Sequence, residues 1–363
     1  MAVPMFDPKE ITNAKEVPGF GGATSVVFDY PTTMREAVLA TYRREPYWLI
    51  TGMGSGLFSP KCNPDNIARG FVYEAASREM GPKDYGGKDM FGIEWEYIET
   101  VGGSMVRPGK PYIEDANEIK DKIVMPDPTK WDWEGTAKRN RGTYLKDTNS
   151  TSMWLLNGWY ERLISFMDFE GAIMALIDDE QKDAVKKFFE ELSDMYIKLL
   201  DCAIKAFPEV DVFYIHDDWG SQKETFFAPS VAEEMIVPYM RTVNDFLHSK
   251  GKYTEFHCCG QNLKQVPNMI KAGWDCWSPQ AMNDTWTEYE LYGDKIIIGV
   301  MPEQFDPSKL SEAEQRQKAR EFVDRFMKPG KPCVLNYNGM GVVTKAYAAE
   351  LYEYSRKKCC GML

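Results

Sequence analysis

The chain has 363 residues, of which 44% are hydrophobic and 27% charged, and a formal net charge of −12. This balance is typical of a globular protein with a sizeable core, and the acidic charge argues against nucleic acid or an anionic membrane surface as a partner. No apolar run approaches the roughly 18 residues of a spanning helix. The N-terminal stretch MAVPMFDPKEITNAKEVPGFGG does not resemble a signal peptide, and the eight cysteines are too sparse for a secreted disulfide framework. These features predict a cytoplasmic enzyme or binding protein.

Residues 1–34 are rich in Gly, Pro and charge, and we expect them to form an irregular N-terminal arm. Beyond them, short strand-like runs alternate with longer segments of helical period. The strand-like runs are 47–51, 152–156, 210–215, 252–257, 275–279, 295–300 and 332–337. The helical segments are 64–80, 158–177, 180–206, 230–250, 261–272, 285–292, 311–327 and 344–358.

Three of the helical segments begin with the pattern of a capping box, in which a hydroxyl and a carboxylate satisfy each other's backbone amides. The pairs are Ser230 with Glu233, Thr285 with Glu288, and Ser311 with Glu314.

The alternation of strand and helix predicts a parallel sheet and an α/β fold. Seven strands are one short of a closed (β/α)8 barrel of TIM type. Residues 91–113 interrupt the rhythm and predict a β-hairpin excursion that turns at Gly102 and Gly103. We therefore expect a single barrel domain over residues 35–363, preceded by the arm.

The stretch EFHCCGQN, residues 255–262, holds one of only three histidines in the chain. In barrels of this type the chemistry sits at the C-terminal ends of the strands. His257 and Cys259 alternate correctly to point to one side of their strand, and an imidazole with a thiolate is a ligand pair that suits zinc. The alternative is a buried structural histidine beside ordinary core cysteines.

The strand at 210–215 ends in His216-Asp217-Asp218-Trp219. We predict catalytic roles in proton transfer for His216, Asp217 and Asp218. Adjacent side chains on a strand point to opposite faces, so at most one of the two aspartates easily faces the barrel interior. The alternative is that the aspartates only cap the following turn.

Several aromatic side chains lie near the predicted strand ends, where they could line a pocket for a flat, apolar substrate. They are Trp154, Trp159, Trp219, Trp277 and Tyr337. The predicted substrate-binding residues are Trp159, Trp219, Gln280, Tyr337 and Asn338.

The succession of HDDWGSQ, FFAPSVAEEMIVPYMRTV, HCCG and AGWDCWSPQAMND resembles the uroporphyrinogen decarboxylase superfamily, and the similarity extends from about residue 35 onward. The resemblance implies a (β/α)8 barrel. True decarboxylases of the superfamily hold porphyrinogens with an arginine-rich N-terminal segment, which this sequence lacks. Its other branch contains zinc-dependent corrinoid methyltransferases, whose H-x-C motif matches His257 and Cys259.

One feature departs from the thiol-methylating relatives, which carry a further cysteine at the end of the last strand. The corresponding turn here is LNYNGMG, and Cys333 begins the strand, about 15 Å below the rim at roughly 3.3 Å per residue. We therefore expect Glu303 to be the third zinc ligand, with Asp217, Asp218 and Cys333 as the alternatives.

The resemblance implies a methyltransferase that moves a methyl group from a small methylated donor, plausibly a methoxylated aromatic, to the cobalt of a separate corrinoid protein. The D-x-H-x-x-G string typical of a resident corrinoid site is absent from the sequence. The alternatives are a uroporphyrinogen-decarboxylase-like lyase and a non-catalytic small-molecule-binding barrel. The oligomeric state stays open, with a homodimer as one candidate.

Overall fold

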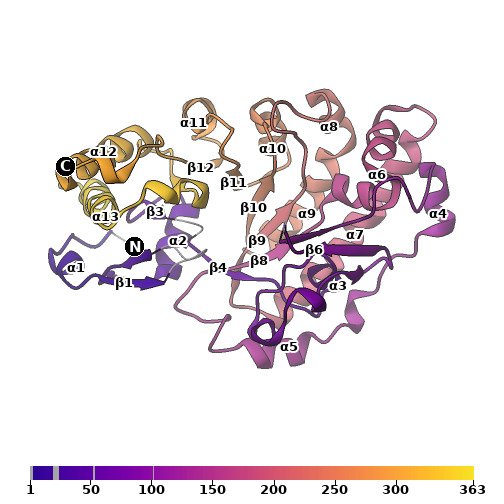
Figure 1. The fold of residues 1–363 in the computed structure, drawn as a ribbon, viewed down its shortest axis with the longest axis horizontal. Coiled ribbons are helices and arrows are strands. Elements are labelled where there is room, and N and C mark those ends of the chain that lie inside the picture. The colour runs from indigo at the N-terminus through magenta and orange to yellow at the C-terminus, as the bar shows by residue number, and fades with distance from the viewer. Residues whose placement is uncertain (1–2, 19–23, 52–53, 101) are drawn as a thin grey trace. The chain divides into compact units, whose positions relative to one another are not determined.

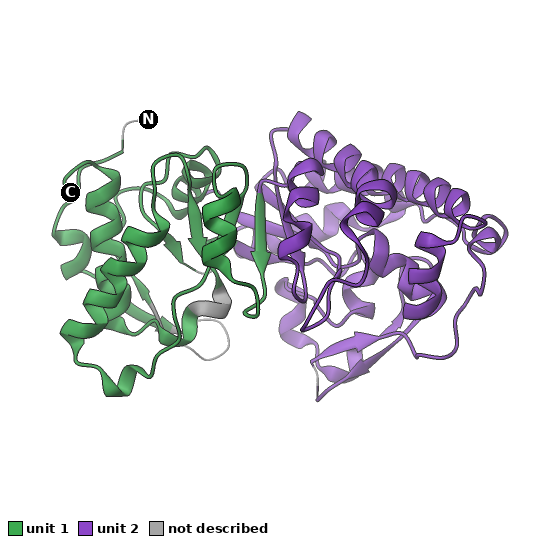
Figure 2. Cartoon of the chain, turned by 90° about the horizontal axis from the view of Figure 1, so that it is seen from above, with its two compact units in different colours: residues 1–55, 148–150, 276–363 green, residues 56–147, 151–275 purple. Residues whose placement is uncertain are grey.

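The computed structural model describes residues 3–18, 24–51, 54–100 and 102–363. The chain forms two compact units (Figure 2). Unit 1 comprises residues 1–55, 148–150 and 276–363, and unit 2 comprises residues 56–147 and 151–275. The expected division into an arm, 1–34, and one domain, 35–363, stays a prediction.

Unit 2 contains four parallel strands (Figure 1). In spatial order they are β4 (Gly56–Phe58), β8 (Thr151–Leu155), β9 (Val210–His216) and β10 (Tyr253–Cys258). Every residue of β9 except His216 is buried. This is the burial expected of a parallel strand that is covered on both faces.

The helices of unit 2 follow its strands along the chain. The longest is α7, which buries an apolar stripe at helical spacing that includes Val185, Phe188, Phe189 and Leu192. The α-helices are α3 (Pro64–Ala68), α4 (Ile119–Lys122), α5 (Trp133–Asn140), α6 (Trp159–Ile177), α7 (Lys182–Ala206), α8 (Pro229–Met235), α9 (Val237–Ser249) and α10 (Val266–Lys271). Among the described residues, no helix has both the length and the apolar character needed to cross a bilayer.

The predicted hairpin excursion is present in unit 2. Strand β6 (Glu94–Ile98) pairs antiparallel with β7 (Gly103–Met105), and a third strand, β5 (Gly87–Lys88), joins β6 on its other side. The turn therefore lies where the glycines at 102 and 103 predict it.

Unit 1 also contains four parallel strands, which are β11 (Cys276–Pro279), β12 (Ile297–Val300), β13 (Cys333–Leu335) and β3 (Ile50–Thr51) in spatial order. Its α-helices are α1 (Lys9–Thr12), α2 (Met34–Tyr42), α11 (Thr285–Tyr292), α12 (Glu312–Phe326) and α13 (Lys345–Cys359). A two-stranded antiparallel sheet, β1 (Lys15–Pro18) with β2 (Thr24–Val27), lies near the N-terminus.

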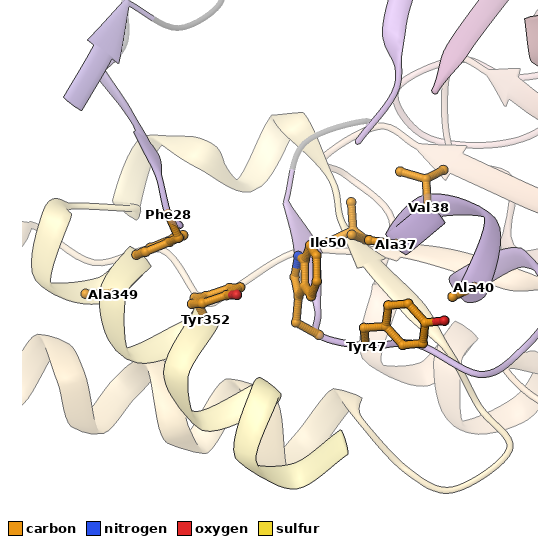
Figure 3. Close-up of a cluster of buried hydrophobic side chains, with 9 residues drawn as sticks. Phe28, Ala37, Val38, Ala40, Tyr47, Ile50, Ala349 and Tyr352 are labelled. Carbon is orange, nitrogen blue, oxygen red and sulfur yellow. The ribbon is translucent and has the colours of Figure 1, made fainter. Parts of the chain in front are cut away.

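The described part of the N-terminal segment packs on helix α13 of unit 1. Phe28 lies in a buried cluster of unit 1 and stacks on Tyr352 of α13 with ring centroids 4.3 Å apart (Figure 3). Glu10 accepts hydrogen bonds from Tyr352 and Arg356 of the same helix. Aromatic packing and a buried ion pair therefore attach this segment to α13.

The eight parallel strands and their helices make the fold α/β, of the (β/α)8 TIM-barrel class. The strand that the sequence did not reveal is β4, which comes between β3 and α3 in chain order. A three-residue strand that begins with glycine has no detectable period-two pattern, which explains why only seven strands were predicted.

Two of the three predicted capping boxes are wrong. The box of Ser311 and Glu314 is confirmed at the start of α12. Helix α8 instead begins at Pro229, since proline is preorganised for the first helical turn. Helix α11 is capped by Asp284, whose carboxylate accepts the amides of Trp286 and Thr287, and Glu288 turns into the interior.

Candidate metal centre

The candidate site is built on the ends of the neighbouring strands β9 and β10 in unit 2. The two strands are parallel, and His216 and His257 are register partners. Because side chains alternate along a strand, Asp218 and Cys259 continue the same face two residues further on. The register therefore brings four potential ligands from two short segments together.

The ligand atoms of His216, Asp218, His257 and Cys259 all lie within 4.8 Å of one another. The Cys259 Sγ is 3.4 Å from the His257 Nε2 and 3.8 Å from the His216 Nε2. The His216 Nε2 is 3.5 Å from the Asp218 Oδ1. The Asp218 Oδ1 also accepts the backbone amide of Cys259 at 2.8 Å, which holds the carboxylate in place.

Three of these separations, at 3.4, 3.5 and 3.8 Å, are those expected between neighbouring ligands of a zinc ion. Bonds of about 2.0–2.3 Å in tetrahedral geometry put neighbouring nitrogen, oxygen and sulfur ligands roughly 3.3–3.8 Å apart. Two imidazoles, a thiol and a carboxylate are also the ligand types that zinc takes in proteins. The donor set present in unit 2 therefore fits zinc.

The charges around the cluster are strongly coupled. Burial would lower the pKa of His216, but the carboxylates of Glu161 and Asp218 raise it well above its ordinary value. Burial would raise the pKa of Asp218, but the charge of His216 and the bond to Cys259 lower it. Burial raises the pKa of the Cys259 thiol to about 11, so a bound cation is what would favour its thiolate.

Residues 163–350, just over half of the chain, match the family model of uroporphyrinogen decarboxylase (URO-D). The chain belongs to the uroporphyrinogen decarboxylase family. Its fold is similar to that of a methyltransferase from Methanosarcina mazei, with 14% identity and a TM-score of 0.56 over 90% of this chain and 99% of that one. At this identity the likeness supports the fold alone. No curated protein matches the sequence.

Two further solved structures are similar at lower TM-scores. One is an IOLI protein with a binding zinc atom, at 11% identity and a TM-score of 0.29 over 70% of this chain and 86% of that one. The other is an endo-beta-1,4-mannanase from Thermotoga petrophila, at 10% identity and 0.29 over 68% and 69%.

In this member of the uroporphyrinogen decarboxylase family, Asp217 points away from the cluster. Its carboxylate accepts the amides of Tyr160 and Glu161 at 3.2 and 2.8 Å and the indole N–H of Trp219 at 3.0 Å. A Cβ at position 158 would lie 2.5 Å from the Asp217 side chain, so this close approach requires Gly158. Burial and the nearby Glu161 raise the pKa of Asp217 to about 7. These contacts favour a structural role for Asp217, and its predicted catalytic role stays a prediction.

Trp159 and Trp219 are fully buried. The indole N–H of Trp159 donates to Ser193, and Trp219 packs against Phe256. Their contacts therefore favour a structural role in the interior of unit 2. The predicted role of both residues in substrate binding stays a prediction.

Trp154, another of the tryptophans near the predicted strand ends, is connected to the candidate cluster through Tyr214. Trp154 of β8 stacks on Tyr214 of β9 with ring centroids 4.4 Å apart, and Tyr214 in turn stacks on His257 at 6.0 Å. Phe71 and Tyr73 each contact the edge of this stack at Trp154. An aromatic wall consisting of Phe71, Tyr73, Trp154 and Tyr214 therefore leads to His257.

The remaining predicted residues belong to unit 1. Gln280 follows β11, and its carbonyl accepts the amide of Asn283. Tyr337 and Asn338 begin a 3-10 segment, Tyr337–Val342, and their side chains lie outside the described part of the structure. The roles of these three residues stay predictions.

Glu303 and Cys333, the other candidates for the third ligand, also lie in unit 1. The side chain of Glu303 is 77% exposed and accepts a hydrogen bond from Arg325 at 3.2 Å. Cys333 begins β13 as expected; it is buried, and its thiol donates to the carbonyl of Phe326. Glu303 as a zinc ligand stays a prediction, while unit 2 supplies four donors by itself.

Sequence reasoning missed Glu161, near the start of α6. Its Oε2 lies 2.6 Å from the Nδ1 of His216, across 55 residues of sequence. The helix that carries Glu161 was predicted, but no local pattern indicates which turn of a helix meets a strand end.

Proposed function

We propose that this chain is a zinc-dependent methyltransferase that moves a methyl group from a small methylated donor, such as a methoxylated aromatic, to the cobalt of a separate corrinoid protein. The observation that carries the proposal is the convergence of His216, Asp218, His257 and Cys259 within 4.8 Å. Membership of the uroporphyrinogen decarboxylase family and the fold shared with a methyltransferase support the same reading.

An aryl methyl ether is hard to cleave because phenolate is a poor leaving group. When bound, zinc supplies a Lewis acid that makes an ether oxygen a better leaving group. The protein's own contribution is to hold the donor set in place: Glu161 bonds to the Nδ1 of His216, and the Cys259 amide bonds to Asp218.

The reaction is balanced by the two substrates and one proton. Cobalt(I) supplies the electron pair for the new cobalt–carbon bond, the carbon–oxygen bond breaks, and the phenolate takes up a proton to become a phenol. With His216 held as a metal ligand, water would be the source of that proton.

The aromatic wall beside His257 supports a flat substrate. Tyr214 is buried between Trp154 and His257, whereas Trp154 is only half-buried. A substrate ring that stacks on Trp154 would gain the dispersion and quadrupole energy of aromatic pairs, about 0.5–1.5 kcal/mol beyond its buried area.

The experiment is to incubate the zinc-loaded full chain anaerobically with cob(I)alamin and a panel of methoxyarenes. We expect methylcobalamin in the absorption spectrum and an equal amount of the demethylated phenol. The variant in which His257 and Cys259 are both replaced with Ala should lose both products. If no methoxyarene supports methylation by protein that holds zinc, the proposal fails, and turnover of a porphyrinogen would favour the lyase alternative.

A further inference from the structure

Glu161 joins the candidate metal centre to an ion-pair network inside unit 2. Its Oε2 lies 2.6 Å from the His216 Nδ1, and its Oε1 accepts from the Arg69 guanidinium at 3.2 Å. The side chains of all three residues are 10–14% exposed. One carboxylate therefore bridges a buried cation and the imidazole of the cluster.

Glu161 and its partner Arg69 are both held in place by further contacts. The Glu161 amide donates to Asp217 at 2.8 Å, which holds the first turn of α6 against the end of β9. Arg69 donates to the Asn157 side chain at 2.5 Å and lies over the Trp95 ring, 5.1 Å from its centroid. Glu161 is thus held through its backbone and through its side chain.

The network continues away from the cluster. Asn157 donates to Asp65 at 3.0 Å, and Asp65 forms an ion pair with the fully buried Arg162. Arg162 also pairs with Asp89 at 2.7 Å. A buried charge whose partner is removed is strongly destabilised, so each member of this chain restricts the position of the next.

The contact with Glu161 decides which nitrogen of His216 faces the cluster. A carboxylate only accepts hydrogen bonds, so Nδ1 must carry the proton between the two groups. The Nε2 is the nitrogen near Asp218 and Cys259, at 3.5 and 3.8 Å. A lone pair on Nε2 is the form of imidazole that binds a metal.

We infer that Glu161, backed by Arg69, is the positioning residue that fixes the tautomer and ring orientation of His216 and so makes it a zinc ligand. This inference rests on the metal centre of the proposed function. Partners of this kind typically change metal affinity by about 10- to 100-fold. Glu161 itself does not contact the proposed metal.

The most informative variant is Glu161→Gln, because it keeps the shape of the side chain. The glutamine side chain lacks the charge that pairs with Arg69. Its NH2 group can donate a hydrogen bond to the His216 Nδ1, and the imidazole proton would then lie on Nε2, which faces the cluster. The matched control is Glu74→Gln, a fully buried glutamate of unit 2 that accepts a hydrogen bond from Asn140 and lies outside the network.

Zinc affinity is measured by competition with a chromophoric chelator, and coordination is followed by the absorption of the Co2+-substituted full chain. We expect Glu161→Gln to weaken zinc binding about 10- to 100-fold and to alter the Co2+ bands. Glu74→Gln should leave both unchanged, and Arg69→Gln should weaken binding in the same direction as Glu161→Gln.

A second measurement needs no variant. The chain has only three histidines, so 15N-histidine labelling gives a spectrum with few signals, and the zinc-bound protein should show His216 protonated on Nδ1. Two results would overturn the inference and leave the proposed function standing. One is a wild-type chain that binds zinc with His216 protonated on Nε2. The other is a Glu161→Gln variant that binds zinc as tightly as wild type with unchanged Co2+ bands. A wild-type chain that binds no zinc would overturn both the inference and the proposed function.

Discussion

Buried carboxyl groups in this chain, such as those of Asp217 and Glu161, accept hydrogen bonds, whereas Glu288 accepts none from any described residue. It is fully buried on α11, and neither of its carboxyl oxygens has a hydrogen-bond partner within the described residues. Burial, with a contribution from the charge of Asp284, raises its pKa from 4.5 to about 8. The folded chain therefore favours the neutral acid at this position.

This raised pKa predicts how stability depends on pH. Below about pH 4.5 the group is protonated in both states, whereas between 4.5 and 8 only the folded state keeps the proton, so the free energy of unfolding falls as pH rises. The shift corresponds to about 5 kcal/mol at most. We expect Glu288→Met to gain stability relative to wild type steadily from pH 5 to pH 8.5 in denaturant titrations.

The control for this prediction is Glu290→Met, at an exposed position of the same helix. It should show no such gain. A difference between wild type and Glu288→Met that stays constant across this pH range would show that Glu288 ionises normally in the folded chain.

Asp218 and Glu303 are two candidates for a zinc ligand besides His257 and Cys259. Asp218 lies within the cluster, whereas Glu303 is exposed and bonded to Arg325. Asp218→Ala should therefore weaken zinc retention about tenfold or more, and Glu303→Ala should leave it unchanged. Equilibrium dialysis with elemental analysis checks both. Loss of zinc from the Glu303 variant, with retention by the Asp218 variant, would restore the ligand set expected from the sequence.

At the scale of elements, the start of α6 organises the site. Gly158 lets the chain approach β9, Asp217 caps the first turn, and Glu161 reaches His216 from that turn. The cap satisfies backbone amides that the helix cannot satisfy itself, and a negative charge is favoured at a helix N-terminus.

Removing this cap should destabilise the chain. Asp217→Ala leaves two helix amides and the Trp219 indole N–H without their acceptor, and we expect a loss of about 2–4 kcal/mol in the free energy of unfolding. Asp217→Asn keeps one acceptor oxygen and should lose less. Denaturant unfolding of both variants, with the exposed cap variant Asp284→Ala as a smaller reference, tests this. Equal losses in Asp217→Ala and Asp284→Ala would argue against the cap.

The elements that could be predicted are those with strong local patterns. The apolar runs of β9 and β10 and their period of two predicted that His257 and Cys259 share a face and that only one of Asp217 and Asp218 turns inward. The structure has both arrangements, with Asp218 in the cluster and Asp217 beneath α6. Their roles as ligands and catalysts stay predictions.

The parts that could not be predicted depend on contacts between distant segments. Glu161 meets His216 across 55 residues, and which of several tryptophans lies beside the cluster depends on how β8 pairs with β9. Local capping patterns also failed where Pro229 takes the first helical position of α8 and where Asp284 is the N-cap of α11.

At the scale of the whole molecule, the candidate ligands are unevenly distributed. Each unit contributes four parallel strands to the fold, yet all four candidate ligands come from unit 2. Of the eight cysteines, which are all free thiols, only Cys259 lies in the cluster. Zinc in this site should therefore be bound by a single sulfur atom, the Sγ of Cys259.

X-ray absorption at the zinc edge of the zinc-loaded full chain tests this claim most directly. We predict one sulfur neighbour at about 2.3 Å, with nitrogen and oxygen neighbours at about 2.0–2.2 Å, and loss of the sulfur signal in Cys259→Ser. Cys333→Ala should leave the spectrum unchanged. Two sulfur neighbours, or one sulfur that survives in Cys259→Ser, would contradict the account and place the zinc on a different set of ligands.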